Sequence, residues 1–366
     1  MDYMADLKCH FRPKKGWMND PNGLVFFKGY YHLFFQYDPE NEVPGTQPAK
    51  WGHARTKDFL NWEELPIAIV TEEPYDKDGC WSGTAIVKDD ILYIFYASCC
   101  AESPAPQTIS MAYSDDGISF KKYEGNPIIP NYPAEGSHDF RDPAVMESDG
   151  KYYLVVASGK PEKNEGNLLS YESEDLFNWK YKGVAAEWQN AVFCECPSFM
   201  RYDDKYLLST SVMIHIPDKH FFTVMYGDFD GTRFETQTKG DFQRGPDSYA
   251  GQIFLDNKGR HILITWIPGW SFIGFAERSV SAMSVPIEIT EKNGKIYGYP
   301  VEEVRHLLKD SDPLVKMTDD GFIVEREKRE NVIHKGKIDD IKIIRDGYIL
   351  EIFVNGGEDV YSIIIC

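Results

Sequence analysis

The chain of 366 residues repeats one strand pattern five times, and this repeat limits its fold more than any other feature of the sequence. Each unit has short apolar runs separated by turn residues, such as Asp149-Gly150 and Asn257-Lys258-Gly259. The units start at Gly23, Gly83, Asp142, Cys196 and Ala250, at intervals of 60, 59, 54 and 54 residues. Repeats of this length with about four strands are typical of propeller blades. The sequence therefore predicts an all-β fold, a five-bladed β-propeller, with a regularly spaced β-sandwich as the alternative.

The pattern changes near residue 300. Pro300 at a first helical position, with apolar residues at 301, 304, 307 and 308, predicts a linking helix over residues 300–309. Strand-like runs follow at 322–324, 341–344, 348–354 and 360–365, with hairpin turns at Asp346-Gly347 and Asn355-Gly356-Gly357. We expect residues 1–299 to form the propeller and residues 310–366 a short antiparallel β module packed on it.

Composition excludes several classes of function. A net charge of -19 would repel nucleic acid from most of the surface. The seven Cys form no Cys-x-x-Cys pattern, so we expect no zinc and no other metal. The N-terminus lacks the basic and apolar regions of a signal peptide, and no apolar run reaches membrane-spanning length. These features predict a reduced, cytoplasmic protein without a membrane or nucleic-acid partner.

Three acids stand at matched places in the repeat. Asp20 precedes the first start, Asp142 opens the third, and Glu195 precedes the fourth. Because the first strand of each blade lines the central channel, we expect these acids to converge, with Arg141 beside them. Like charges in a partly dry pocket raise at least one pKa, so that one carboxyl holds a proton near neutral pH. A protonated acid facing an ionised carboxylate suits glycoside hydrolysis, whereas the alternative is that each acid caps a turn separately.

Several motifs together resemble glycoside hydrolase family 32, the β-fructofuranosidases that include invertases, sucrose-6-phosphate hydrolases, inulinases and levanases. The resemblance runs in order from residue 10 to about residue 305. The motifs are residues 17–23 (Trp-Met-Asn-Asp-Pro-Asn-Gly), 35–37 (Phe-Gln-Tyr), 51–54 (Trp-Gly-His-Ala), 81–83 (Trp-Ser-Gly), 141–143 (Arg-Asp-Pro) and 195–197 (Glu-Cys-Pro).

The resemblance implies roles for the acids. Asp20 is similar to the nucleophile that forms a covalent fructosyl-enzyme, and Glu195 to the general acid/base. Asp142 is similar to the residue that binds fructose hydroxyls as positive charge develops. A retaining outcome implies that nucleophile and acid lie roughly 5–5.5 Å apart.

The resemblance also implies residues that bind the sugar, although core packing of the aromatics and turn or strand-end hydrogen bonding of Asn19 and Gln36 are alternatives. The implied substrate-binding residues are Asn19, Gln36, Trp51, Trp81, Ser82, Arg141, Tyr249, Gln252 and Trp266.

Two departures from the family pattern affect what we expect. The family carries a full C-terminal β-sandwich, whereas about 55–60 residues follow the propeller here, so the module is predicted to be truncated and a homodimer to replace lost contacts. Residues 41–49 before Trp51 also differ from the family loop, which leaves the preferred leaving group open.

The resemblance predicts a retaining β-fructosidase that acts on sucrose or short fructo-oligosaccharides without a cofactor. Within the same class, a sucrose-6-phosphate hydrolase would need a cationic pocket, for which Lys50, Arg55 and Lys57 are candidates, and a fructosyltransferase is a further alternative. From other classes come a catalytically silent sugar-binding propeller and a structural propeller. Retention of all three acids favours the enzyme.

Overall fold

The computed structural model describes residues 7–42, 47–214, 219–268, 281–327 and 329–365. Four residues of the rim segment 41–49 and the first six residues, on which the signal-peptide prediction partly rests, therefore lie outside the described residues. Strands account for nearly all of the regular secondary structure in the described chain, which confirms the predicted all-β class. None of its helices has the length and apolar character that a membrane-spanning helix requires.

Five antiparallel sheets follow one another along the chain, each built mainly from consecutive hairpins. The first sheet contains β1 (Trp17–Phe27), β2 (Tyr30–Asp38), β3 (Lys50–Thr56) and β4 (Glu63–Ile69). The second contains β5 (Gly79–Lys88), β6 (Ile91–Cys99), β7 (Gln107–Ser114) and β8 (Lys121–Lys122). The third contains β9 (Phe140–Ser148), β10 (Lys151–Lys160), β11 (Glu165–Ser173) and β12 (Lys180–Gln189), with a short 3₁₀ helix, η1 (Pro161–Lys163), between β10 and β11.

The last two of these sheets complete the series. The fourth contains β13 (Ala191–Tyr202), β14 (Lys205–Ile214), β15 (Lys219–Phe229) and β16 (Phe234–Gly240). The fifth contains β17 (Tyr249–Leu255), β18 (His261–Ile267), β19 (Ala282–Met283), β20 (Ile287–Lys292) and β21 (Lys295–Pro300).

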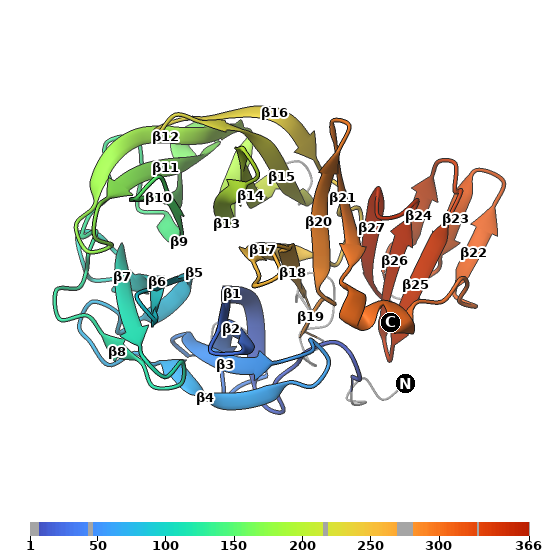
Figure 1. The fold of residues 1–366 in the computed structure, drawn as a ribbon, viewed down its shortest axis with the longest axis horizontal. Coiled ribbons are helices and arrows are strands. Elements are labelled where there is room, and N and C mark those ends of the chain that lie inside the picture. Colours follow the sequence, from blue (N-terminus) through green and yellow to red (C-terminus); the bar gives the residue numbers. More distant parts are fainter. Residues whose placement is uncertain (1–6, 43–46, 215–218, 269–280, 328, 366) are drawn as a thin grey trace.

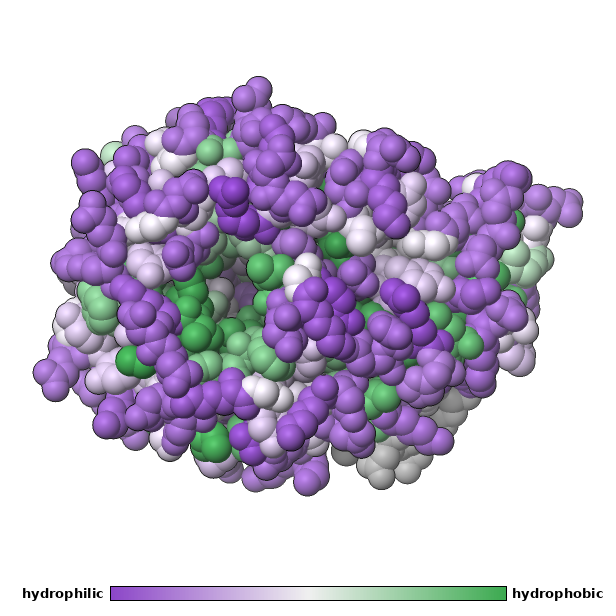
Figure 2. Space-filling view, viewed as in Figure 1, coloured by the Kyte–Doolittle hydropathy of each residue, from purple (hydrophilic) through white to green (hydrophobic). Residues whose placement is uncertain are grey.

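The first strand of each sheet faces a common centre (Figure 1). Each of the inner strands β1, β5, β9 and β13 contacts the inner strand of the next sheet, and β17 contacts β1. Burial follows this arrangement, because β9 is buried at almost every position while the outer strand β4 is largely exposed. Apolar clusters fill the spaces between neighbouring sheets rather than one central core. Viewed from the same side, the surface is hollowed near the middle of the ring (Figure 2).

Each inner strand is interrupted at a corresponding place, where its pairing with the next strand shifts register. Such bulges bend a strand and redirect its side chains. Three non-glycine residues at these interruptions, Asp142, Cys196 and Ala250, have positive φ angles of 55°, 48° and 52°. This left-handed conformation is costly for L-residues, so the surrounding structure must hold it in place.

The connection after the fifth sheet differs from the prediction. Pro300 ends β21 instead of opening a helix, and a short 3₁₀ helix, η3 (Glu302–Leu307), follows. Val304 is its buried residue. The predicted helix over residues 300–309 is thus shorter and of another type: six residues are helical, too few for a regular α-helix to be favoured over the tighter 3₁₀ form.

Two three-stranded sheets form the C-terminal part. One contains β22 (Val315–Thr318), β23 (Gly321–Val324) and β24 (Val332–Lys335), and the other contains β25 (Ile341–Asp346), β26 (Ile349–Val354) and β27 (Asp359–Ile364). Phe322, Ile352 and Ile363 belong to one apolar cluster that both sheets share, so the sheets pack face to face. Strands β22 and β24 were not predicted from the sequence; each is four residues long and contains exposed positions.

The C-terminal sheets are attached to the rest of the chain by backbone and charged contacts. The backbone N–H of Arg244 donates to the carbonyl of Val360 at 2.8 Å. The buried His10 ring lies between two carboxylates of these sheets, with Nδ1 3.0 Å from Asp346 and Nε2 3.1 Å from Glu351. The N-terminal segment, the fifth sheet and the C-terminal sheets are thus held together around buried polar contacts.

Candidate active site

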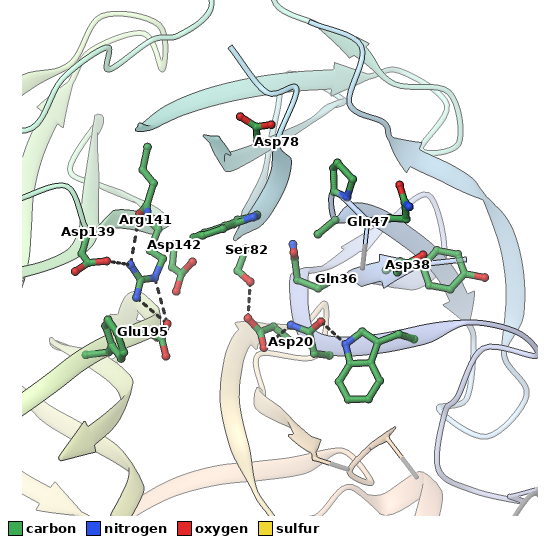
Figure 3. Close-up of a pocket in the computed structure, with 18 of the residues that line it drawn as sticks. Asp20, Gln36, Asp38, Gln47, Asp78, Ser82, Asp139, Arg141, Asp142 and Glu195 are labelled. Atoms are coloured by element: carbon green, nitrogen blue, oxygen red, sulfur yellow. Dashed lines mark hydrogen bonds and ion pairs between the residues drawn. The ribbon is translucent and has the colours of Figure 1, made fainter. Parts of the chain in front are cut away.

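A cavity of about 760 Å³ lies at the centre of the ring of inner strands, among the register shifts (Figure 3). This volume is within the range of small-molecule sites. The lining residues are Trp17, Asn19, Asp20, Gln36, Tyr37, Asp38, Gln47, Pro48, Ala49, Asp78, Trp81, Ser82, Gln107, Asp139, Arg141, Asp142, Phe193, Glu195 and Met213. The three acids singled out by the repeat therefore share one cavity.

Asp20 lies in the first register shift of β1, and three donors fix its carboxylate. Ser82 Oγ donates to Oδ2 at 2.6 Å and Asn19 Nδ2 donates to Oδ1 at 3.1 Å. The thiol of Cys196 lies 3.4 Å from Oδ2, and burial raises its pKa well above the usual value, so the thiol keeps its proton and can donate. Burial also raises the pKa of Asp20, while the Ser82 hydrogen bond opposes the rise. The carboxylate is thus oriented from several sides.

Glu195 lies just before the register shift of β13, and each of its carboxylate oxygens has a different partner. Oε1 accepts from Arg141 Nε at 3.1 Å and Nη2 at 3.0 Å. Oε2 accepts from the Tyr249 phenol at 2.6 Å. The Glu195 side chain is 22% exposed, so it can exchange protons with water. Arg141 also binds Asp139 at 2.7 Å, and its guanidinium lies between the two acids.

Asp142 is 3% exposed and is the most enclosed of the three acids by its surroundings. The backbone N–H of Cys196 donates to its Oδ2 at 2.8 Å. Burial raises the pKa of Asp142 to about 7; Arg141 opposes the rise, and the charges of Glu195 and Asp20 add to it. Burial and the neighbouring acids therefore both favour the neutral form of Asp142.

Close backbone packing positions the Ser82 side of the cavity. Gly83 follows the register shift of β5, and a Cβ there would lie 1.9 Å from the carbonyl oxygen of Phe95. Only glycine fits at such a distance. The residue type at position 83 thus allows β5 to approach β6 closely enough to present Ser82 to Asp20.

The structure brings some of the predicted sugar-binding residues to the cavity wall and leaves others behind it. Asn19, Gln36, Trp81, Ser82 and Arg141 line the cavity. Asn19 is oriented by the Trp17 indole, which donates to its Oδ1 at 3.0 Å, and Gln36 by the carbonyl of Cys80 at 3.0 Å. The Asn19 amide thus links the Trp17 indole to the Asp20 carboxylate.

Trp51, Gln252 and Trp266 do not line the cavity, so direct contact with a sugar does not follow from this structure. The Trp51 side chain is fully buried and donates to the carbonyl of Trp81 at 2.9 Å. Gln252 donates to the carbonyl of Gly83 at 2.9 Å. The Trp266 indole donates to Ser281 Oγ at 2.5 Å. These three side chains pack behind the cavity wall and hydrogen-bond to other protein groups, so they support the residues that line the cavity.

Tyr249 also lies behind the cavity wall, but its phenol donates a hydrogen bond to the carboxylate of Glu195. Burial and the charge of Glu195 raise the pKa of Tyr249 well above its usual value, so the phenol keeps its proton and donates a hydrogen bond to Glu195. The sequence marked Tyr249 through its motif, but the phenol's partner is visible only in the structure.

Sequence reasoning missed several polar residues of the wall. Asp38, Asp78 and Asp139 line the cavity together with Gln107. Asp139 precedes Arg141 by two residues, so strand alternation around the Arg-Asp-Pro motif was a signal that could have identified it. No comparable local signal marks Asp38 or Asp78, which reach the cavity from the end of one strand and the segment before another.

One cluster elsewhere has the composition of a metal site: Cys9, His10 and Asp346. Burial works against a charge on His10, but its hydrogen bonds to Asp346 and Glu351 outweigh burial and raise its pKa well above the usual value. Both ring nitrogens are engaged by carboxylates, so His10 serves as a protonated link and has no free nitrogen for a metal.

The matching family model and two curated relatives agree on one family. Residues 10–300 match the model of the glycosyl hydrolases family 32 N-terminal domain. A raffinose invertase of Escherichia coli is 34% identical over 325 residues, covering 83% of this chain and 66% of that protein. A sucrose-6-phosphate hydrolase of Zymomonas mobilis is 32% identical over 329 residues, covering 83% of this chain and 63% of that protein. The chain thus spans just under two thirds of the length of these relatives.

The fold is similar to a solved structure along the whole chain. A Bombyx mori β-fructofuranosidase variant, solved in complex with sucrose, superposes with a TM-score of 0.85 at 25% identity. The superposition covers 100% of this chain and 90% of that one. The similarity therefore includes the C-terminal sheets as well as the ring of five.

Proposed function

Because the chain belongs to glycoside hydrolase family 32, we propose that it is a retaining β-fructofuranosidase that releases terminal β-D-fructofuranosyl residues from sucrose or short fructo-oligosaccharides. The observation that carries the proposal is the meeting of Asp20, Asp142 and Glu195 in one cavity, from the inner strands of three different sheets. Two carboxyl groups on opposite sides of a glycosidic bond are what retaining hydrolysis requires.

In this proposal Asp20 is the nucleophile. Its carboxylate is held by Ser82 and Asn19, so one oxygen can be directed at the anomeric carbon of the fructosyl group. Attack forms a covalent fructosyl-enzyme and breaks the bond to the leaving sugar. Water then attacks the same carbon and releases fructose with its configuration retained.

Glu195 is the acid and base. It gives its proton to the departing oxygen in the first step and takes a proton from water in the second. Arg141 and Tyr249 hold its two oxygens, which fixes the direction of proton transfer. Asp142, buried beside Arg141, accepts hydrogen bonds from fructose hydroxyls as positive charge develops on the ring.

We further propose that residues 1–299 form a five-bladed β-propeller, residues 300–309 a link, and residues 310–366 a separate β-sandwich-like module. Five successive sheets whose inner strands contact one another around a centre support the first part. A shared apolar cluster between the two last sheets supports the third.

The charge of the cavity favours a neutral substrate over sucrose 6-phosphate. Its lining contains acids beyond the proposed catalytic three, while Arg141 is the cation among the described lining residues and already binds two acids. Lys50, Arg55 and Lys57 are not part of the lining. A phosphate would therefore meet like charge, so we expect kcat/KM for sucrose to exceed that for sucrose 6-phosphate at least tenfold.

The reduced state of the cysteines supports a cytoplasmic location. The six cysteines of the described residues are all free, and Cys99 and Cys194 are buried. We propose that the reaction needs no cofactor and that the protein has no nucleic-acid partner. A homodimer is also proposed, for which exposed Met317 and Ile333 in the β22–β24 sheet provide a candidate contact, and sedimentation of the purified chain would test it.

The decisive experiment measures free fructose from sucrose, sucrose 6-phosphate, 1-kestose, inulin and levan. Asp20→Asn and Glu195→Gln should each lower kcat by several powers of ten, while Asp149→Asn, on an exposed turn, should leave it unchanged. No release from any substrate by folded protein would reject the hydrolase, and sugar binding without turnover would support the silent propeller. Transfer products at high sucrose would instead support a fructosyltransferase.

A further inference from the structure

The C-terminal sheets reach the back of the cavity through one buried carboxylate, Asp247, which lies two residues before Tyr249. Its oxygens accept from Arg326 Nη1 at 2.7 Å, from Arg329 Nη1 at 2.9 Å and from the backbone N–H of Ile364 at 2.9 Å. Arg326 and Arg329 lie in the connection between β23 and β24, and Ile364 ends β27. All three donors thus belong to the C-terminal sheets.

This cluster is buried and held by several hydrogen bonds. The side chains of Asp247, Arg326 and Arg329 are exposed by 2%, 3% and 2%. Arg326 is additionally held by the carbonyl of Glu330 at 2.6 Å. Burial raises the pKa of Asp247, and the two guanidinium groups oppose this rise. Buried and multiply bonded charges of this kind fix geometry, because moving one would leave the others without compensation.

A short route joins Asp247 to Glu195. Only Ser248 separates Asp247 from Tyr249, whose phenol donates to Glu195 Oε2 at 2.6 Å. Consecutive Cα atoms are about 3.8 Å apart, so a displacement of Asp247 is passed on within two peptide units. The residue after Tyr249 is held at positive φ, and the backbone there has little freedom to absorb the displacement.

We propose that Arg326 and Arg329 of the C-terminal sheets, by binding Asp247, hold Tyr249 where its phenol donates to Glu195, and so set the pH range of the acid step. The inference rests on the proposed role of Glu195. None of Asp247, Arg326 and Arg329 lines the cavity, so they are positioning residues. The C-terminal sheets would thereby contribute to the reaction and not only to stability.

A purely structural role makes different predictions, and Asp346 offers a matched control. Asp346 is also a buried carboxylate at a junction of the C-terminal sheets, and it binds the backbone N–H of Cys9 and the ring of His10. Its described contacts do not include Glu195 or Tyr249. Asp346→Asn should therefore lower stability as Asp247→Asn does, without acting on the acid.

The first test is the pH dependence of kcat/KM for sucrose in Asp247→Asn, Tyr249→Phe, the double variant and Asp346→Asn. A phenol that donates a hydrogen bond to a carboxylate stabilises the charge of that carboxylate, so removal of the Tyr249 phenol should move the pH profile of the reaction. We expect the alkaline limb to move up by about one pH unit in Tyr249→Phe and by about half a unit in Asp247→Asn.

The double variant isolates the route between the two residues. If Asp247 acts through Tyr249, the double variant should have the profile of Tyr249→Phe alone. Three outcomes would overturn the inference. These are an alkaline limb that does not move in Asp247→Asn, shifts of the two single variants that add in the double variant, and a shift in Asp346→Asn equal to that in Asp247→Asn.

A second test does not depend on turnover. The second test is a carbon NMR spectrum of protein labelled at the tyrosine Cζ carbons, in which the Tyr249 signal is identified because it is missing from the spectrum of Tyr249→Phe. It should move in Asp247→Asn and stay in place in Asp346→Asn. An unmoved signal in Asp247→Asn overturns the inference even if no fructoside is cleaved, whereas an inactive wild-type protein speaks against the proposed function alone.

Discussion

Replacing Asp142 by Asn should stabilise the protein while abolishing its activity. Burial and neighbouring acids raise the pKa of Asp142 from 3.8 to about 7. The unfolded chain therefore releases this proton more readily than the folded chain, and the free energy of unfolding falls as pH rises from about 4 to about 7. The neutral Asn avoids this loss. Its side chain also suits the left-handed conformation of position 142, at φ 55°.

The size of the effect follows from the shift. At about 1.36 kcal/mol for each pKa unit, the cost of ionising Asp142 in the folded chain is on the order of 4 kcal/mol at pH 8. At pH 4 the folded chain keeps almost all of this proton and the unfolded chain still keeps roughly 40% of it, so the advantage of Asn should be below about 1 kcal/mol. The gap in the free energy of unfolding between variant and wild type should thus widen up to about pH 7 and level off by pH 8.

Urea unfolding followed by tryptophan fluorescence at pH 4, 5, 6, 7 and 8 would measure this gap. Asp139→Asn is the control, because Asp139 is another acid beside Arg141 but its side chain is 31% exposed, so its removal should not give a gain that grows with pH. The opposite reasoning holds that the Asp142–Arg141 pair is a net stabiliser. A variant less stable than wild type at pH 8, or a gap independent of pH, would refute the burial argument.

Three further changes test other parts of the structure. Asp346→Asn should lower the free energy of unfolding by about 3–5 kcal/mol, because it leaves His10 buried without one of its carboxylates; thermal melts at neutral pH would show it. Gly83→Ala should lower stability by about 3 kcal/mol or more and reduce sucrose turnover, because its Cβ meets the Phe95 carbonyl. Asp78→Lys should raise kcat/KM for sucrose 6-phosphate relative to sucrose at least tenfold, measured by fructose release from both.

Each of these changes has an internal comparison. Gly150→Ala places a Cβ in open space at a positive φ, so it should cost only about 1 kcal/mol, and an equal loss at both glycines would contradict the steric reasoning. An unchanged substrate ratio in Asp78→Lys would mean that the leaving sugar does not approach residue 78. Stability of Asp346→Asn equal to wild type would mean that the His10 charge is compensated by Glu351 alone.

The strand repeat, and the place of each acid within it, can be read from the order of the residues alone. Alternation of apolar residues and turn signals are local properties, so the five sheets and the turns of the C-terminal hairpins could be predicted from neighbours along the chain. Asp20, Asp142 and Glu195 followed from the same repeat, because equivalent positions of a repeat occupy equivalent places. The family motifs added roles that spacing could not supply.

Only the tertiary structure decided which side chains reach the cavity and which support it. Trp51 and Trp81 have similar motif signals, yet one is buried and hydrogen-bonded to the backbone of the other. Arg326 and Asp247 are 79 residues apart, and nothing local announces their contact. The reason is physical: hydrogen-bond partners, burial and pKa depend on through-space distances of a few ångströms, which are set when the sheets pack and the bulges turn their side chains.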